Sequence, residues 1–332
     1  MPNPTIFPAN LTFLGFAKEG ATTYGTPAAA PAFWVPLDSP SWKPGQKQLP
    51  DEALRGDMAK LHGVVAGTRS DTMSYSTNLY LDTLYPHMLG VLGNADTVTG
   101  SADPWLHATA LKNTGNAQPT SWTLWLFNGS ECWQMAGSIV SKVEIDVKAE
   151  DAAKLQVEWM GLPATQVTTP TNTPSTSKMW PSWNTTITVA GTQATSYSDV
   201  KLSYTRECSV VQTADGTQAP YVIFVGPLSV GLDLNGVYQG YAGTPTDLSN
   251  LLTNGQPAFT VQVNPAGDTT HYAKWQHSTV AVDSDGAEVK MSAGKYVEIT
   301  AKYSAVANAT DALGGGQSPV KFSLANAVSA AY

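Results

Sequence analysis

Apolar and polar residues alternate with a period of two over several stretches of this chain, a pattern typical of strands with one buried face. In residues 142–148 (K-V-E-I-D-V-K), Val143, Ile145 and Val147 share one face and charged residues share the other. Further strands are predicted at residues 72–81, 121–127, 155–160 and 228–234. Short helices are predicted at residues 51–61 and 86–92. The pattern therefore predicts an all-β fold with short helices.

The predicted elements recur in the same order in the second half of the chain. A Thr/Pro-rich segment, residues 163–184, interrupts the pattern as a linker would. Beyond it, W-Q-H-S-T-V-A-V-D corresponds to the earlier W-Q-M-A-G-S-I-V-S, although only the W-Q pair is identical and any all-β chain can be aligned with itself. The corresponding segments are residues 33–37 and 185–189, 72–81 and 228–234, 86–92 and 247–255, 121–127 and 257–263, 133–141 and 275–283, and 155–160 and 296–301. We therefore predict two tandem modules, residues 1–162 and 185–332, joined by the linker 163–184.

Charge and cysteine content narrow the class of protein. Charged residues make up 13% of the chain, about half the usual share. The net charge of −8 argues against a sequence-independent DNA clamp, which needs clustered Lys and Arg. The longest apolar run, residues 221–232, is broken by Gly and Pro and is shorter than a membrane span of about 20 residues, and the N-terminal stretch does not resemble a signal peptide. Cys132 and Cys208 form no disulfide framework, so we expect buried thiols and folding in a reducing cytoplasm.

Motifs for catalysis and metal binding are absent from the sequence. It contains no H-E-x-x-H, P-loop, G-x-S-x-G or G-x-G-x-x-G motif. His271 and His277 share a face of one strand-like stretch but lack a nearby Cys or a clear carboxylate partner, which favours surface histidines over a zinc site. The sequence predicts neither an enzyme nor a cofactor nor a metal.

Ten tryptophans keep a second class of function open, a carbohydrate- or receptor-binding β-sandwich such as a phage adhesin. Four of them occupy apolar strand positions, where packing in the core or between subunits explains them better: Trp122, Trp125, Trp133 and Trp159. Three others stand beside prolines in predicted loops and are expected to pack onto a neighbouring subunit: Trp42, Trp180 and Trp183.

Three short motifs, in this order, carry a resemblance to a known family. They are E-G-A-T-T-Y-G-T-P-A (19–28), D-E-A-L-R-G (51–56) and S-P-V-K-F-S-L-A-N-A-V (318–328). The chain resembles the tail tube proteins of long, non-contractile bacteriophage tails, and together the motifs span nearly the whole chain. The resemblance implies tail-tube-like β-sandwich or barrel modules that self-assemble as stacked rings into the hollow tube of the virion, after synthesis in the host cytoplasm.

The resemblance also implies partners. These are further copies of the chain, the tape measure protein, the tail terminator and tip proteins, and genomic DNA in transient passage, with no membrane. Because each chain has two predicted modules, three chains would supply the six modules of a ring. A homotrimeric ring with pseudo-six-fold symmetry is therefore preferred, and a hexameric ring remains the alternative.

Residues 39–63 are predicted to form a loop that contacts the adjacent ring. The segment is rich in proline and too poorly patterned for a core. Trp42 is the expected anchor, and the expected polar contacts are Lys43, Asp51, Glu52 and Arg55. The second half has a shorter loop at residues 208–221, so the modules should contribute unequally to stacking. Residues 1–30 and 310–332 are expected to be mobile in the free subunit and to become ordered on neighbouring subunits in the tube.

Strands that line a bore need alternation with a polar face. Residues 72–81, 142–148, 228–234 and 278–283 meet this requirement, and the predicted lumen-lining residues are Ser74, Ser76, Asn78, Glu144, Asp146, Ser229, Asp233 and Asp283. Carboxylates and hydroxyls would let DNA slide where a basic bore would grip it, so we predict a negatively charged conduit. The same positions could instead be solvent faces outside the tube, and Lys142 and Lys148 weaken the case for their strand.

Overall fold

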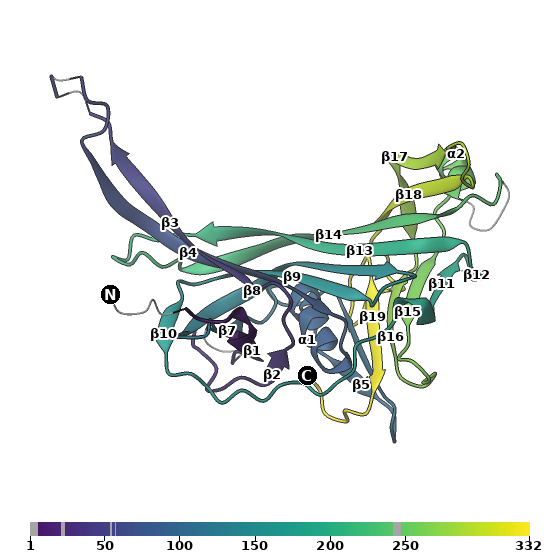
Figure 1. Ribbon diagram of the computed structural model, residues 1–332, viewed down its shortest axis with the longest axis horizontal. Coiled ribbons are helices and arrows are strands. Elements are labelled where there is room, and N and C mark those ends of the chain that lie inside the picture. The colour runs from purple at the N-terminus through teal and green to yellow at the C-terminus, as the bar shows by residue number, and fades with distance from the viewer. Residues whose placement is uncertain (1–5, 21–23, 54, 57, 242–246) are drawn as a thin grey trace.

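Antiparallel β-sheets dominate the computed structural model of the protein, which describes residues 6–20, 24–53, 55–56, 58–241 and 247–332. Two α-helices and two short 3-10 turns, η1 (Ala9–Leu11) and η2 (Ser182–Asn184), complete this part of the chain. The predicted all-β fold with short helices is confirmed (Figure 1).

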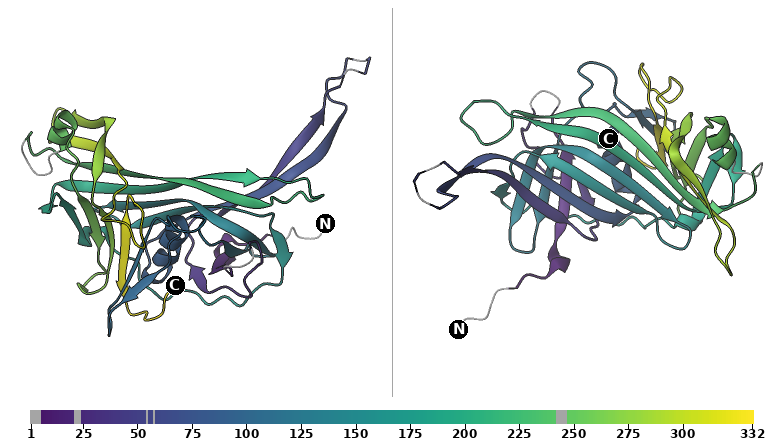
Figure 2. Two further views of the ribbon diagram at one scale, coloured as in Figure 1. Left: turned by 180° about the vertical axis from the view of Figure 1, so that it is seen from behind. Right: turned by 90° about the horizontal axis from the view of Figure 1, so that it is seen from above.

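Eight strands pair side by side to form one wall of the molecule (Figure 2). Every neighbouring pair is antiparallel. In order across the wall they are β3 (Ser41–Asp51), β4 (Gly63–Asn78), β9 (Lys154–Gly161), β8 (Cys132–Lys148), β13 (Tyr197–Val211), β14 (Val222–Val237), β18 (Glu298–Ala305) and β17 (Val280–Lys290).

Shorter strands cover one face of this wall (Figure 1). The first part of β8 pairs on one side with β10 (Thr165–Val167) and on the other with β7 (Trp122–Phe127), which continues to β1 (Phe13–Lys18) and β2 (Phe33–Val35). A separate seven-stranded sheet has the order β12 (Thr192–Ala194), β11 (Thr185–Val189), β15 (Phe259–Val263), β16 (Tyr272–His277), β19 (Lys321–Asn326), β6 (Trp105–Ala110) and β5 (Thr97–Thr99).

The two helices pack against equivalent places in the wall, α1 (Leu81–Leu92) against β8 and α2 (Asp247–Thr253) against β17. Almost all of α1 is buried, and a Cβ added at Gly90 would lie only 2.5 Å from Cγ2 of Val140, so glycine permits this close approach. The helix begins five residues before the predicted start at Pro86, which therefore lies inside it. It ends at Gly93, whose φ of 81° is left-handed and whose N–H donates to the Leu89 carbonyl oxygen.

The strand order in the wall repeats, as β3-β4-β9-β8 and then β13-β14-β18-β17. Both terminal strands are bulged at the same step, β8 after Val140 and β17 after Val282. The covering strands repeat too, with one difference from the sequence alignment. β11 lies between β12 and β15 as β1 lies between β2 and β7, so residues 185–189 correspond to β1 rather than to residues 33–37.

The predicted loop at residues 39–63 is largely a strand, because β3 forms a long hairpin with β4. The helix expected at residues 51–61 is wrong for the described residues of that segment, which contain no helix. The hairpin of β13 and β14 is nearly as long as the hairpin of β3 and β4. In the β3–β4 hairpin, 30 residues (43–72) lie between the paired residues Trp42 and Met73. In the β13–β14 hairpin, 29 residues (203–231) lie between the paired residues Leu202 and Leu232. The expected difference in length between the two segments is therefore also wrong.

Two further expectations change with the pairing of short segments. Residues 165–167, placed in the linker by the sequence, form β10 in the wall's first covering layer. Lys321–Asn326, placed by the sequence in a C-terminal tail that is mobile in the free subunit, is the interior strand β19 between β16 and β6. The last residue, Tyr332, packs on the rings of Tyr85 and His107, each with a centroid distance of 4.9 Å. The C-terminal segment is thus ordered within its own chain.

A buried carboxylate explains the first motif, residues 19–28. Glu19 is 4% exposed and accepts hydrogen bonds from Ser121 Oγ (2.6 Å), Thr123 Oγ1 (2.7 Å) and the backbone N–H of Gly137 (2.8 Å). Tyr24 donates its hydroxyl to the Gly137 carbonyl oxygen at 2.7 Å. Residues 21–23 of the motif lie outside the described residues. The motif therefore fixes the segment after β1 onto β7 and β8.

Replacing Glu19 by Gln should lower the free energy of unfolding by about 1–3 kcal/mol, because an amide cannot accept all of these hydrogen bonds and leaves buried donors unpaired. Urea unfolding of the dissociated protein measures this change. Glu131→Gln, at an exposed turn, is the matched control and should change the free energy by less than about 0.5 kcal/mol. Equal stabilities of the two variants would contradict the role of Glu19.

Candidate functional site

The eight-stranded wall turns one face to the core and the other, here called the polar face, away from it. On β8, Ile145 and Val147 are fully or almost fully buried, and Glu144 and Asp146 alternate with them on the opposite side. The register carries this alternation across the strands: one row runs Ser76, Gln156, Glu144, Ser203, Gly231 and Ser304. Pleating and register together thus produce one continuous hydrophilic surface.

All eight residues predicted to line a lumen lie on this polar face. Six are placed by the rows of paired strands: Ser74, Ser76, Asn78, Glu144, Asp146 and Asp233. Ser229 pairs with Thr205, which continues the row of Lys142. Asp283 lies in the bulge of β17 and accepts a hydrogen bond of 2.7 Å from Ser304 Oγ on the same face. The structure therefore brings together residues from four separate sequence segments.

The polar face carries charges of both signs. Seven lysines occupy its paired positions: Lys43, Lys142, Lys148, Lys154, Lys201, Lys290 and Lys302. Seven carboxylates do so as well: Glu144, Asp146, Glu158, Asp199, Asp233, Glu288 and Glu298. The paired positions are therefore balanced in charge, and Asp283, in the bulge of β17, adds one carboxylate. The excess of negative charge on this face is small, and the negatively charged bore remains a prediction.

Several of these charges form ion pairs. Glu144 lies between Lys201, at 3.0 Å, and Lys142, at 3.2 Å. Lys142 also approaches Glu158 at 3.7 Å, and a separate pair joins Lys148 to Asp146 at 3.0 Å. Burial raises the pKa of Glu144, but the hydrogen bonds from Lys201 and Lys142 outweigh this effect and hold that pKa below its ordinary value. Glu144 is therefore ionised at neutral pH.

The β3–β4 hairpin extends well beyond the body of the molecule (Figures 1 and 2). Near its tip are two ion pairs, Arg55 with Asp51 and Lys60 with Glu52, all with exposed side chains. Its end also carries exposed apolar side chains: Leu49, Met58, Leu61, Val64 and Val65. An exposed apolar group of this kind is typical of a contact surface.

Trp42 packs against residues of its own chain. Its ring lies 4.8 Å from the ring of Trp133, and its Nε1 donates to Asp71 Oδ2 at 3.2 Å. Asp71 is fully buried and also accepts from Arg69 and from the backbone N–H of Ala164. Trp42 therefore anchors β3 to its own chain, and its role as the anchor between rings remains a prediction. Lys43, the next residue, lies on the polar face opposite Thr72.

The two outer strands of the wall each have one partner among the described residues. β3 pairs only with β4, and β17 pairs only with β18. Each therefore presents a row of backbone N–H and C=O groups without a strand beside it, which is a template for pairing with another chain.

A family model described as phage tail tube protein matches residues 9–327. The chain belongs to this family. No curated protein matches it. Tail tube proteins are structural components of the virion tail that associate with one another into a tube, so the polar face and the unpaired edges are the surfaces to consider for assembly and for the bore.

The tryptophans of this tail tube protein give no support to a sugar-binding platform. Five are buried in the core: Trp122, Trp125, Trp159, Trp180 and Trp275. Of the ten, all within the described residues, only Trp183 is largely exposed. A flat binding surface for sugars needs several exposed rings, and this chain presents one.

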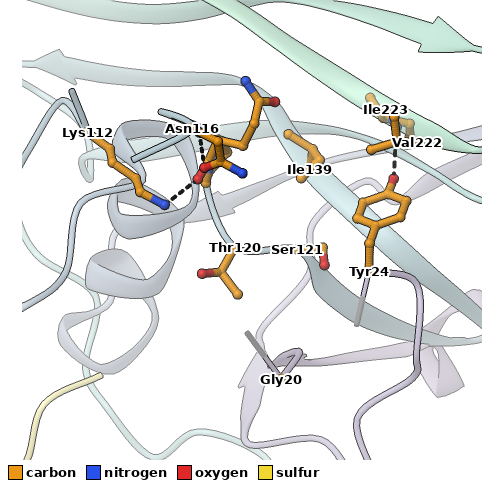
Figure 3. Close-up of a pocket in the computed structure, with 11 residues that line it drawn as sticks. Gly20, Tyr24, Lys112, Asn116, Thr120, Ser121, Ile139, Val222 and Ile223 are labelled. Atoms are coloured by element: carbon orange, nitrogen blue, oxygen red, sulfur yellow. Dashed lines mark hydrogen bonds between the residues drawn. The ribbon is translucent and has the colours of Figure 1, made fainter. Parts of the chain in front are cut away.

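Cavities and ionisable clusters likewise point to structural roles. A cavity of about 290 Å³ lies between the segment after β1, the segment before β7 and β14 (Figure 3). Two of its polar groups already have partners: Lys112 Nζ donates to the Gln118 carbonyl oxygen at 2.6 Å, and the hydroxyl of Tyr24 accepts from the Ile223 N–H at 3.1 Å. The described residues contain neither a group of three or more His, Cys, Asp or Glu suited to a metal nor a helix long and apolar enough to cross a membrane.

The histidines differ from the expected surface positions. His277 is fully buried, with Nδ1 3.0 Å from the Pro319 carbonyl oxygen, and burial lowers its pKa to about 4. His271 is held between two carboxylates: Nδ1 binds Asp268, and Nε2 lies 3.0 Å from Asp103. Asp103 precedes β6 and Asp268 lies between β15 and β16, so His271 links the β15–β16 turn to the segment before β6, which is two strands away across β19. The hydrogen bond with Asp268 raises its pKa above 6.5.

This link should make stability depend on pH. Protonated His271 stabilises the fold fully below about pH 6.5, and the effect is lost as the pH rises through its raised folded-state pKa. The lowered pKa of Asp268 means that its contribution is lost only in strong acid. His271→Asn should therefore lower Tm more at pH 6 than at pH 9 in thermal unfolding. A difference in Tm between His271→Asn and the natural protein that is independent of pH would contradict the link. Asp103→Asn removes one of the two carboxylates, so it should weaken the pH dependence of Tm without abolishing it.

Proposed function

We propose that three copies of this chain close head to tail into a ring, that the rings stack into the hollow tail tube, and that the polar face lines the bore through which the genome is ejected. In this assembly each chain contributes two tube modules, so that the ring has pseudo-six-fold symmetry. The observation that carries the proposal is the repeated strand order of the wall, with a complete junction inside the chain and unpaired strands at both edges.

The junction inside the chain serves as a template for the junction between chains. Within the chain, β8 of the first repeat pairs antiparallel with β13 of the second. In the repeated order, β17 corresponds to β8 and β3 corresponds to β13. The unpaired β17 of one chain should therefore pair with the unpaired β3 of the next, and three chains of eight strands would close a barrel of 24 strands.

The repeat also gives a register for this pairing. Trp159 lies between Met73 and Val140, and Tyr303 lies between Leu232 and Val282 in the same way. Counting from these two positions, Glu288 corresponds to Glu144, and Lys43 corresponds to Ser203.

Ser203 and Glu144 are directly paired within the chain, so Lys43 and Glu288 should be directly paired between chains. Lys43 has no ion-pair partner among the described residues, and Glu288 would supply one. Opposite charges at directly opposed positions favour the register.

The charge balance of the polar face suits a conduit. DNA binds strongly to surfaces whose Lys and Arg displace its counterions. On this face the lysines are matched by carboxylates and interleaved with hydroxyl and amide side chains such as Ser76, Gln156 and Thr300. A duplex would therefore find few free cations along its path. The tape measure protein would occupy the same bore before ejection, and terminator and tip proteins would contact the end rings.

The β3–β4 hairpin is the element best suited to contact the adjacent ring. It projects beyond the wall, and its end combines exposed apolar residues, Leu49 and Val65 among them, with the charged residues Asp51, Glu52 and Arg55. The apolar side chains would become buried on the next ring, and the charged groups would form the rim of the contact.

A designed disulfide tests the ring. Directly opposed residues of antiparallel strands have Cα atoms about 4.5–5.5 Å apart, within the range that a disulfide spans. Lys43→Cys combined with Glu288→Cys should therefore give, on oxidation of assembled tubes, a closed species of three chains that reduction returns to monomers. Each single variant should remain uncrosslinked, as should Lys43→Cys with Asp233→Cys, which places the second thiol on an inner strand. Closed species of six chains would favour the hexameric ring, and the absence of crosslinks would contradict the β17–β3 junction.

Shortening the hairpin tests stacking. Residues 47–68 can be replaced by Asn-Gly, which closes a two-residue turn on the paired residues Gln46 and Arg69. The wall and its edges remain, so the variant should form rings that do not elongate, visible as short discs with a central hole in negative-stain microscopy. Tubes of normal length would show that the hairpin end is not the contact between rings.

A further inference from the structure

One carboxylate on the polar face binds two lysines at once. Glu144 accepts from Lys142 of its own strand and from Lys201 of the neighbouring strand, at 3.2 and 3.0 Å. We propose that Glu144 is the charge-compensating residue of the bore: it withholds both ammonium groups from the phosphates of passing DNA, so that the duplex slides instead of binding. This inference rests on the proposed function, in which the polar face lines the bore.

The position of Glu144 suits this role. Its strand, β8, and the strand of Lys201, β13, are the fourth and fifth of the eight, so the cluster lies in the middle of the wall. The side chain of Glu144 is 12% exposed, against 31% for Lys142 and 42% for Lys201. The carboxylate therefore lies deeper than the two ammonium groups, and a phosphate approaching the face would meet the lysines first. The Glu144 carboxylate behind the two lysines keeps them from binding the phosphate.

The other ion pairs on the face are simpler. Lys148 with Asp146, at 3.0 Å, and Lys290 with Glu288, at 3.4 Å, each join one lysine to a carboxylate two residues away on the same strand. Losing one of these acids would free a single ammonium group. Losing Glu144 would remove the one ion pair that Lys201 forms among the described residues and leave Lys142 only the longer contact of 3.7 Å with Glu158. Glu144 therefore controls the largest amount of cationic charge on this face.

The test compares DNA binding by the dissociated protein, in which the polar face is open to solvent. Glu144→Gln should bind a short fluorescent duplex at low salt, whereas the natural protein should bind it weakly or not at all. Each phosphate neutralised adds about 0.9 to the slope of log K against log salt, so Glu144→Gln should steepen that slope by about 0.9 through Lys201 and by up to about 0.9 more through Lys142, which keeps its longer contact with Glu158. Asp146→Asn, which frees Lys148 alone, should steepen it by about 0.9.

Two controls isolate the effect. Glu131→Gln removes the same charge from an exposed turn away from the face and should leave DNA binding unchanged. Adding Lys142→Gln and Lys201→Gln to Glu144→Gln should abolish the gained affinity. If Glu144→Gln does not fold, Asp146→Asn still tests compensation, because its ion pair is more exposed.

Virions separate this inference from the proposed function. Fully assembled tails that carry Glu144→Gln should release DNA more slowly than the natural tails, most strongly at low salt. If neither Glu144→Gln nor Asp146→Asn gains DNA binding in solution, the proposal that carboxylates keep these lysines from binding DNA is overturned, whether or not the polar face lines the bore. A gain in solution together with natural ejection rates would instead overturn the bore assignment, and with it the role of Glu144 in ejection.

Discussion

The structure depends on the antiparallel ladder between β8 and β13. This ladder joins the two repeats into one wall, because β8 closes the first set of four strands and β13 opens the second. Its buried side carries Val143 against Tyr204 and Ile145 against Leu202, all fully buried. Its other side carries Glu144 and Lys201. The β8–β13 ladder therefore contributes to the core and makes the polar face continuous across the two repeats. It also provides the geometry on which the junction with a neighbouring chain is proposed.

Period-two alternation was informative wherever a strand has one buried face. Residues 142–148 and 228–234 were assigned to strands with the correct faces, and Ser74, Asp146 and Asp233 do share one surface. The family resemblance, carried by three short motifs, is confirmed by the match over residues 9–327. The faces of these strands can be predicted from the sequence, because alternate residues of a strand point to opposite faces and the buried face is therefore apolar.

Other features depend on pairing between distant segments, which no local pattern reveals. The sequence predicts a loop where β3 lies, because an edge strand with prolines buries little of its own surface. It predicts a mobile tail where β19 lies, because the partners of this strand, β16 and β6, are far away in sequence. The lysines of the polar face are hidden from the sequence for the same reason: Lys154, Lys201 and Lys302 come from strands outside the segments with a predicted polar face, and only the register places them beside the acids.

The two kinds of junction in the proposed ring are not equal. Inside the chain the repeats are joined twice, by β8 with β13 in the wall and by β6 with β19 in the seven-stranded sheet. The hairpin that supplies β6 comes from the long connection between α1 and β7, whereas α2 and β15 are joined by only five residues, 254–258. The second repeat therefore has no hairpin to offer, and β10, which corresponds to β19, keeps one edge without a strand among the described residues.

A β17–β3 junction between chains would consequently be held by strand pairing in the wall and by contacts between rings, without a second strand pair in the covering sheet. Assembly would then be reversible between chains, while the two repeats of one chain stay together. A chain with two fused repeats thus places its strongest junctions inside the polypeptide, where they form during folding, and leaves only the weaker ones to be made during tube growth.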